Sequence, residues 1–451
     1  MQLKTLIALT AIVAAIGLAG AQSAAAPAPV PALSVDEAIA KAVSNQPLIL
    51  QAESSVAAAR AKEEQAKSAY LPNVSVTGSY VYLEPQEGIA LPLGPPIGLL
   101  QAALAPQNVL DFHAGASELI YDFGKRELQV KLAETGVDAA GIGIDQIKTS
   151  IAFQTAQVFD SALFLRAEIK VLDEQLATLD QHLQDTEKRE ETGSSTHYDV
   201  LTTQVRLASV KSQRIDAMGQ YEKQRIALKE LMGLGPAEDF DIRGDFSLAT
   251  VPSDPQAALS AAMDQRPDLA QSLSSEKQAQ LVLSLAKLGH MPTISTQFEA
   301  GFKNGILTFT NTDINSLLFN WDFGLMVSVP VFDGLLTERR SAEADAKLAA
   351  ARSGTDALRR TVTTQVLQAL QDVESSHEQT DNSLAQLDQA QEALNMAKVQ
   401  YDIGVGTNLE YLDSQTSLEL AKLNNLSATY RELLSQLQLE QALGTRLWAK
   451  S

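Results

Sequence analysis

The chain has 451 residues, of which 45% are hydrophobic and 20% charged, so it carries enough apolar surface to fold and is not a disordered chain. Its 55 acidic and 35 basic side chains give a formal net charge of −20, which argues against a nucleic-acid partner because phosphate binding needs Lys and Arg. The absence of cysteine excludes thiol catalysis, disulfides, thiolate metal sites and a lipid-modified cysteine.

The start of the chain, residues 1–21, has the pattern of a secretory signal peptide. Lys4 precedes the apolar run Leu6–Leu18, and the small residues Ala19–Ala21 follow. This run is too short to predict a membrane-spanning helix, which needs about 20 apolar residues. We expect cleavage after Ala21, with Ala26 as the alternative site, and therefore export from the cytoplasm.

Long stretches without proline predict very long helices. No proline lies between Pro106 and Pro236 or after Pro330, and a proline inside a helix costs about 3 kcal/mol. In the first gap, apolar residues recur at alternating spacings of four and three, which is the heptad pattern of coiled coils. They are Leu165, Ile169, Leu172, Leu176, Leu179 and Leu183. We predict long helices over 125–190 and 335–402, each followed by a Gly-containing turn and a second helix, over 197–232 and 408–446. A simple two-helix coiled coil is the alternative.

The sequence repeats itself once. Pro47 and Pro267 are 220 residues apart, and so are Pro72 and Pro292. Farther along the offset is 211 residues, in the pairs Gly193 and Gly404, Thr196 and Thr407, Gln204 and Gln415, and Gly233 and Gly444. The two offsets differ because the repeats differ in length in one Pro-rich connector, and surface loops tolerate such differences. We therefore divide the mature chain into two structural repeats, 22–240 and 241–451.

Each repeat contains two segments in which apolar and polar residues alternate. This period of two predicts strands over 73–84, 110–120, 293–303 and 320–331. In the first segment, for example, Val74 and Val76 alternate with Ser75 and Thr77. Segments of about ten residues can cross a bilayer as tilted strands, although a half-buried soluble sheet gives the same pattern. The export signal, the aromatic residues and the long connectors favour an outer-membrane barrel.

Four strands per chain cannot close a barrel, and open sheet edges are not tolerated in lipid. Closure therefore requires several chains, and three copies would supply about twelve strands, an even number within the known range. The sequence thus predicts an α+β fold, mainly α. It comprises an internally duplicated chain of long coiled-coil helices and four strands per chain in a trimeric 12-stranded transmembrane β-barrel.

Together these features resemble the TolC-like outer-membrane efflux proteins, the outer membrane factor family. The likeness is carried by Leu33–Ala38 with Asn45–Pro47, by Leu71 and Pro72, by Val329–Gly334 and by Tyr401–Thr407. It implies a passive homotrimeric duct in the outer membrane of a Gram-negative-type bacterium, with a large periplasmic portion. In that portion the long helices would form an α-barrel, a periplasmic coiled-coil tube. Such a duct exports substrates received from a periplasmic adaptor (membrane fusion) protein and an inner-membrane transporter, in tripartite efflux or type I secretion. The resemblance also implies an equatorial belt around the tube, to which 233–254 and the tail beyond Gly444 contribute.

The resemblance assigns the periplasmic tip to the turns between helices. By position, Asp199, Glu410 and Asp413 match acidic residues that narrow the pore, and Tyr401 matches a tyrosine that helps to close it. The adaptor-docking turns would contain Gly193, Gly404, Val405, Gly406 and Thr407. The family archetype has an Arg at the position of Gly406, so a gate latched by that Arg cannot form in the same way here.

Asp199 and Glu410 are also equivalent under the 211-residue offset. In a trimer they would form a ring of six carboxylates that attracts cations. The alternative interpretation is a solvated helix start, where acidic side chains interact favourably with the helix dipole.

No enzyme signature occurs in the sequence. The five histidines, His113, His182, His197, His290 and His377, show no metal-ligand spacing. A G-x-S-x-G elbow, a phosphate-binding loop and a dinucleotide fingerprint after a strand are also missing. We therefore expect no catalytic residue, cofactor or metal, and transport energy supplied by a partner. The alternative function is an exported coiled-coil protein that tethers the envelope without a pore.

Overall fold

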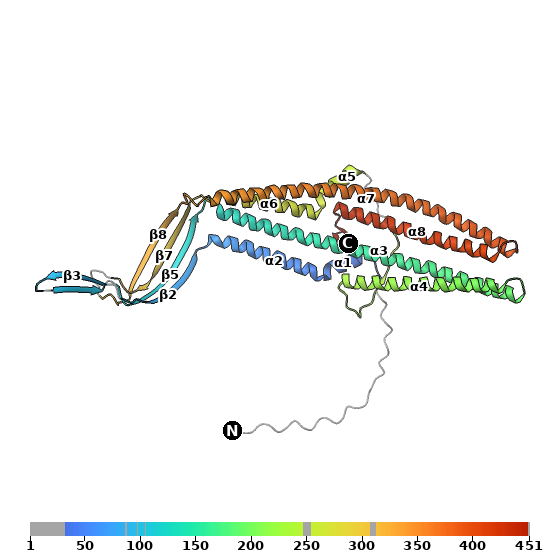
Figure 1. The fold of residues 1–451 in the computed structure, drawn as a ribbon, viewed down its shortest axis with the longest axis horizontal. Coiled ribbons are helices and arrows are strands. Elements are labelled where there is room, and N and C mark those ends of the chain that lie inside the picture. The colour runs from blue at the N-terminus through green and yellow to red at the C-terminus, as the bar shows by residue number, and fades with distance from the viewer. Residues whose placement is uncertain are drawn as a thin grey trace, which may run out of the picture.

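The computed structural model describes residues 32–85, 88–96, 98–103, 105–246, 254–306 and 313–449. The expected signal peptide, 1–21, lies outside the described residues. The molecule is elongated, with its helices in one long bundle and its strands at one end of that bundle (Figure 1). Each repeat contributes a short helix, a second helix, a pair of long strands, a very long helix and a final helix, in that order.

The helices of the first repeat are α1 (Val35–Asn45), α2 (Pro47–Lys67), α3 (Lys125–Glu191) and α4 (His197–Leu231). Those of the second repeat are α5 (Pro255–Gln265), α6 (Pro267–Lys287), α7 (Leu336–Asp402) and α8 (Asn408–Leu443). Two short 3-10 helices are η1 (Ser68–Tyr70) and η2 (Leu447–Ala449). Within the described residues, no helix has a stretch apolar enough to cross a membrane.

The two longest helices, α3 and α7, have 67 residues each, which corresponds to about 100 Å at 1.5 Å per residue. The heptad seam predicted in the first of them is present. Leu172 and Leu179 of α3 are buried against Leu207 and Val210 of α4. The same cluster includes Leu412 of α8, so the seam joins more than two helices, and a simple two-helix coiled coil does not describe the molecule.

The shorter helices stack end to end, so that two of them extend beside one long helix. The side chain of Asn45, at the junction of α1 and α2, donates to the Met232 carbonyl just after α4, at 3.1 Å. In the second repeat, Arg266 just before α6 donates to the Ala442 carbonyl of α8, at 3.2 Å. These bonds use carbonyl groups that a helix end leaves without intrahelical partners. Each repeat thus supplies one continuous and one interrupted column of helix.

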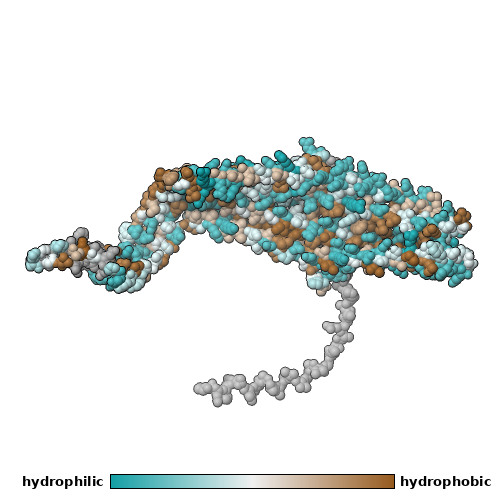
Figure 2. Space-filling view, in the orientation of Figure 1, coloured by the Kyte–Doolittle hydropathy of each residue, from teal (hydrophilic) through white to brown (hydrophobic). Residues whose placement is uncertain are grey.

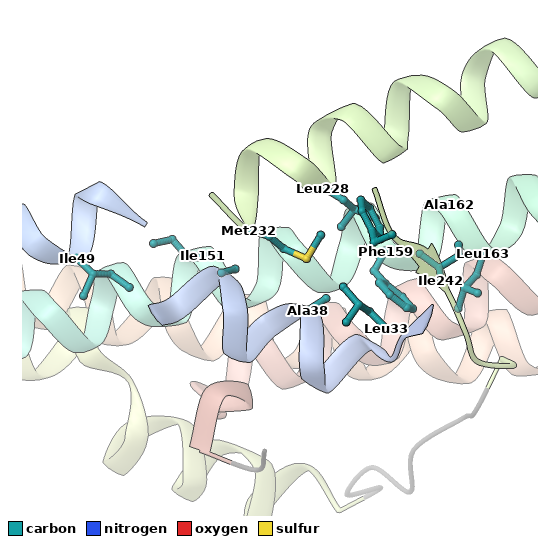
Figure 3. Close-up of a cluster of buried hydrophobic side chains, with 12 residues drawn as sticks. Leu33, Ala38, Ile49, Ile151, Phe159, Ala162, Leu163, Leu228, Met232 and Ile242 are labelled. Atoms are coloured by element: carbon teal, nitrogen blue, oxygen red, sulfur yellow. The ribbon is translucent and has the colours of Figure 1, made fainter. Parts of the chain in front are cut away.

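The largest core cluster lies near the middle of the bundle, where α1, α3 and α4 meet (Figure 3). Phe159 of α3 fills its centre, between Leu33 before α1, Leu228 of α4 and Met232 just after α4. A short parallel pair, β1 (Ala32–Leu33) with β6 (Asp241–Ile242), closes this cluster. The carboxyl-terminal η2 packs on α1 and α3. These irregular segments lie at the middle of the helical bundle, where the belt is expected, and residues 247–253 of the expected belt lie outside the described residues.

The main sheet has the strand order β2-β5-β7-β8 and is antiparallel throughout. Its strands are β2 (Asn73–Tyr82), β5 (Asn108–Tyr121), β7 (Thr293–Lys303) and β8 (Leu318–Ser328). The pairing of β5 with β7 joins the two repeats. Within the described residues, β2 and β8 each pair on one side only, so the sheet has two open edges.

The register places apolar side chains in rows across one face of this sheet. One row runs through Val74, Ala116, Phe298 and Phe323, and the next through Val76, Ala114, Ala300 and Trp321. The large members of both rows are exposed, for example Val76 by 83% and Phe323 by 65%. The other face carries polar rows, such as Ser75, Gly115, Glu299 and Asp322. Figure 2 shows apolar surface both at the strand end and over the middle of the helical body.

A second hairpin, β3 (Gly88–Gly94) with β4 (Gly98–Ala103), lies in the Pro-rich connector, where the sequence predicted only a loop. That expectation was wrong for a physical reason. Pro92 lies in a two-stranded sheet, in which each strand has a free edge that tolerates a missing N–H. Pro95 and Pro96 occupy the turn. The hairpin extends beyond the main sheet, away from the helices (Figure 1).

Candidate channel tip

The two turns between helices lie at the end of the bundle opposite the sheet (Figure 1). Gly193 ends α3 with φ of 73°, and Gly404 ends α7 with φ of 77°. A side chain at either glycine would be strained, because this left-handed backbone favours glycine. The Gly193 amide donates to the Glu190 carbonyl at 2.9 Å, and the Gly404 amide donates to the Tyr401 carbonyl at 3.1 Å. The two repeats therefore form the same turn.

Each turn leads into a helix that begins with a reciprocal capping box. The Thr196 hydroxyl accepts from the Asp199 amide, while the Asp199 carboxylate accepts from the Thr196 amide at 3.0 Å. Thr407 and Glu410 make the same pair of bonds at the start of α8. Such boxes satisfy amides that a helix start leaves free. The structure therefore gives Asp199 and Glu410 a capping role, as the helix-start interpretation expects, while each remains at the tip.

Capping also affects the charge of these two carboxylates. Burial alone would raise the pKa of Asp199, but hydrogen bonds from Thr196 and Ser195 outweigh it and hold the pKa below its ordinary value. The backbone and side-chain hydrogen bonds from Thr407 lower the pKa of Glu410. Both side chains are therefore ionised at neutral pH.

Asp413 lies one turn farther along α8 and faces the other repeat. Its Oδ1 lies 3.2 Å from Nη2 of Arg206 on α4. The ion pair is exposed and contributes up to about 1 kcal/mol, but it joins α8 to α4. Of the predicted pore carboxylates, Asp413 is thus the one that an arginine neutralises within the chain.

Tyr401 belongs to an aromatic cluster that the sequence analysis did not identify. Its ring stacks on Tyr411 with centroids 5.5 Å apart, and both rings contact His182 of α3. His182 is only 6% exposed, and its Nε2 lies 2.8 Å from Oδ1 of Asn408. The Asn408 amide also reaches the Asp199 carbonyl at 3.5 Å. One buried network therefore connects α3, α4, α7 and α8 at the tip.

A cation covers this cluster. The Arg189 guanidinium of α3 lies 4.5 Å from the Tyr401 ring centroid and 3.4 Å from an Asp402 carboxylate oxygen. Beside it is a cleft of about 400 Å³ lined by Gln181, His182, Asp185, Arg189, Lys398 and Tyr411. At Gly406 an added Cβ would lie 3.1 Å from Cβ of Gln400. Arg189 thus places a cation on Tyr401 from the neighbouring helix.

Of the remaining histidines, His197 lies at the first tip turn, where its Nδ1 contacts Oε1 of Glu190 at 2.9 Å, and the other three lie away from the tip. His113 bonds to Asp111 and Asn320 on the polar face of the sheet, and His377 bonds to Glu432 in the tube. Within the described ranges, one group of His, Asp and Glu side chains is close enough to hold a metal ion. It consists of His290, Asp333 and Glu338, near the sheet and far from the tip.

Comparisons with known proteins agree with this architecture. A family model described as "Outer membrane efflux protein" matches residues 38–234 and 258–445. Outer membrane protein TolC of Vibrio cholerae is 24% identical over 422 residues, which cover 90% of this chain and 89% of that protein. The solved VceC outer membrane protein of Vibrio cholerae has a TM-score of 0.74 at 18% identity, covering 91% of this chain and 96% of that one. The MtrE outer membrane channel of Neisseria gonorrhoeae has a TM-score of 0.74 at 19% identity, with 92% and 89% covered.

These relatives are outer-membrane channel proteins and not enzymes. The two matched segments correspond to the helices and strands of the two halves of the chain. Because the family model covers most of the sequence, the chain belongs to the outer membrane efflux protein family.

Proposed function

We propose that three copies of this chain form a passive channel through the outer membrane of a Gram-negative-type bacterium. The four strands of each copy would join in one 12-stranded barrel, and the helices would form a tube across the periplasm. The chain would consist of a signal peptide, 1–21, and two structural repeats, 22–240 and 241–451. The channel would carry substrates outward in a tripartite efflux or type I secretion system.

The observation that carries this proposal is the two-faced sheet. Its apolar rows are exposed over all four strands, whereas a half-buried soluble sheet covers its apolar face. Exposed apolar surface of this extent marks a lipid or protein contact. The polar rows on the other face, with Glu299, Asp322 and His113, suit a water-filled lumen.

The open edges of β2 and β8 support self-association. Unpaired backbone amides and carbonyls are costly in lipid, so these edges require partners. The helices have a corresponding unpaired surface. Along α4, Leu201, Val205, Ile215 and Ile226 are exposed at spacings that place them on one stripe of the helix. This stripe would pack against a helix of the next copy.

At the other end, the three tips would together form the pore constriction. Asp199, Glu410 and Asp413 would narrow it and select cations, and Tyr401 would help to hold it closed. The turns with Gly193, Gly404, Val405, Gly406 and Thr407 would dock onto a periplasmic adaptor. Ile403 and Val405 at these turns are exposed, and exposed apolar side chains suit a protein contact. An inner-membrane transporter would supply the energy.

Reconstitution in planar bilayers tests the proposal. The purified protein is expected to insert from detergent as a trimer and to give discrete single-channel currents that favour cations. A water-soluble rod without currents would instead identify an exported coiled-coil tether. One relative is named as a pyoverdine export outer membrane protein in Pseudomonas putida. To identify a comparable small-molecule substrate of this chain, the gene would be deleted and the small molecules released by the mutant and wild-type cells would be compared.

A further inference from the structure

At the junction between the tube and the sheet, three potential metal ligands of the second repeat converge. His290 follows the end of α6, Asp333 lies between β8 and α7, and Glu338 is in the first turn of α7. One ligand atom of each lies within 4.8 Å of the other two. The residues are 43 and 5 positions apart, so no sequence motif reveals the group.

Hydrogen bonding orients the His290 ring. Its Nδ1 lies 3.2 Å from the Pro330 carbonyl oxygen, which only accepts, so Nδ1 carries the hydrogen. Its Nε2 lies 3.3 Å from Oε1 of Glu338. In the neutral ring Nε2 is also an acceptor, so either a proton on Nε2 or a metal ion must lie between it and the Glu338 carboxylate. A metal-binding histidine usually donates one ring N–H to a backbone carbonyl or a carboxylate and binds the metal through its other nitrogen.

Asp333 is held rigidly beside this pair. Its Oδ2 accepts from the Thr337 amide at 2.9 Å and from the Thr337 hydroxyl at 2.6 Å. Its Oδ1 accepts from the Leu336 amide at 3.0 Å and retains a second lone pair. Close packing fixes the two segments together, because a Cβ on Gly289 would lie 2.3 Å from the Thr337 hydroxyl. The ligand atoms of Asp333 and His290 are therefore positioned before any ion binds, whereas Glu338 is exposed and contacts His290.

The first repeat provides an internal comparison, because the same junction there contains its own cation. Arg126 is buried, lies 3.4 Å from Asp122 and covers the Tyr70 ring at 4.6 Å. It also donates to the carbonyls of Ala69 and Ile120, which ties the helix end to the strand end.

Sequence offsets make Tyr70 equivalent to His290, Asp122 to Asp333, and Arg126 to Thr337. The second junction has therefore lost the arginine and gained a histidine. In the described part of the chain, neither Asp333 nor Glu338 forms an ion pair with Lys or Arg, and the ammonium of nearby Lys125 donates to the Met291 carbonyl.

We propose that His290, Asp333 and Glu338 bind one divalent transition-metal ion of the Zn²⁺ class per chain. Nε2 of the histidine and one oxygen of each carboxylate would be the ligands, and water would complete the coordination. One imidazole with two carboxylates suits Zn²⁺, whereas Mg²⁺ and Ca²⁺ prefer oxygen ligands alone. The ion would join the end of α6 to the start of α7, which is the task of Arg126 in the first repeat. This inference does not depend on the proposed transport function.

Calorimetric titration of chelator-treated, full-length protein in detergent tests the site, with ZnCl₂ as the probe and MgCl₂ as the comparison. We expect one Zn²⁺ per chain and weak or absent Mg²⁺ binding. His290→Gln and Glu338→Gln should each weaken Zn²⁺ binding by about tenfold or more. Both substitutions spare Asp333, which caps α7. Replacing Zn²⁺ with Co²⁺ should give a visible absorption band in wild type that both variants lose.

His377→Gln is the matched control, because His377 contacts Glu432 at 2.8 Å without belonging to a group of three ligands within the described residues. It should bind Zn²⁺ as wild type does. If wild type binds no Zn²⁺, the cation between His290 and Glu338 is a proton and the metal assignment is wrong. Equal loss of binding in His377→Gln, or full binding by His290→Gln, would also overturn it.

Discussion

Nε2 of His182 on α3 lies 2.8 Å from the side-chain oxygen of Asn408, the first residue of α8, in the interior of the tip. The pair joins the two repeats. Asn408 in turn reaches the Asp199 carbonyl of α4, so separating the helices at the tip would break a buried polar contact. Leaving a buried donor or acceptor unsatisfied costs about 1–3 kcal/mol.

The burial of His182 makes tip opening sensitive to acid. Burial is the main cause that lowers the pKa of His182 below its ordinary value, so the opened tip binds a proton more readily than the closed tip. Stability of the closed tip should therefore fall as the pH drops below about 6.5, the ordinary pKa of histidine. Single-channel recordings with the tip-facing solution acidified from pH 7.5 to 5.5 should show longer open times. His182→Gln, which keeps a side-chain donor but cannot gain a charge, should lose this response.

The Arg189 contact should hold α3 to α7. Replacing Arg189 with Ala removes a cation–π contact and an exposed ion pair with Asp402, which together contribute about 1 kcal/mol. That loss corresponds to a roughly fivefold shift toward the open tip, measurable as open probability. Lys188→Ala is the control, because Lys188 pairs only with Asp185 on its own helix among the described residues, at 3.7 Å. Equal effects of the two substitutions would contradict a specific role for Arg189.

The tip carboxylates should set ion selectivity. Asp199→Asn, Glu410→Gln and Asp413→Asn keep oxygens that can accept the capping bonds but remove the charges. The triple variant should remain folded and show a reversal potential closer to zero across a salt gradient, because fewer negative charges attract cations. Glu191→Gln, at the exposed end of α3, should leave selectivity nearly unchanged. Unaltered selectivity in the triple variant would limit Asp199 and Glu410 to their capping role.

The two faces of β2 should respond oppositely to charge. Val76→Lys places a charge in the apolar row and should cost about 2–4 kcal/mol in a bilayer. Thr77→Lys, at the next residue along β2, places the same charge on the polar face. We expect Val76→Lys to abolish assembly in the outer membrane, measured as heat-resistant trimers on gels, and Thr77→Lys to assemble. Assembly of both variants would contradict a lipid-facing row.

Much of the architecture follows from local sequence patterns. The long segments without proline predicted the two long helices, because a proline inside a helix would interrupt it. The heptad spacing predicted that these helices pack against others. The alternation of apolar and polar residues predicted the main strands, because one face of the sheet carries apolar side chains and the other carries polar ones. The β3–β4 hairpin was missed because proline argues against strands in general, although Pro92 is acceptable in a two-stranded sheet.

The tip was predictable only in part. The turn glycines and the acidic residues after them were visible because they are close in sequence. The contact of Tyr401 with His182 was not, because the two residues are 219 positions apart (401 − 182) and meet only when α3 and α7 pack together. Arg189 was equally hidden, because it reaches Tyr401 from another helix and no local motif links the two residues.

Disulfide cross-linking between copies tests whether β2 of one chain pairs with β8 of the next to close a trimeric barrel. Because the sequence contains no cysteine, any cross-link must come from the introduced residues. One cysteine would be placed on the polar face of β2, at Ser75, and a second at each polar-face position of β8 in turn, including Asn320 and Asp322. If the open edges pair between copies, at least one combination should form covalent trimers in outer membranes under oxidising conditions. Only monomers across the whole series, with the protein recovered in water, would contradict the channel.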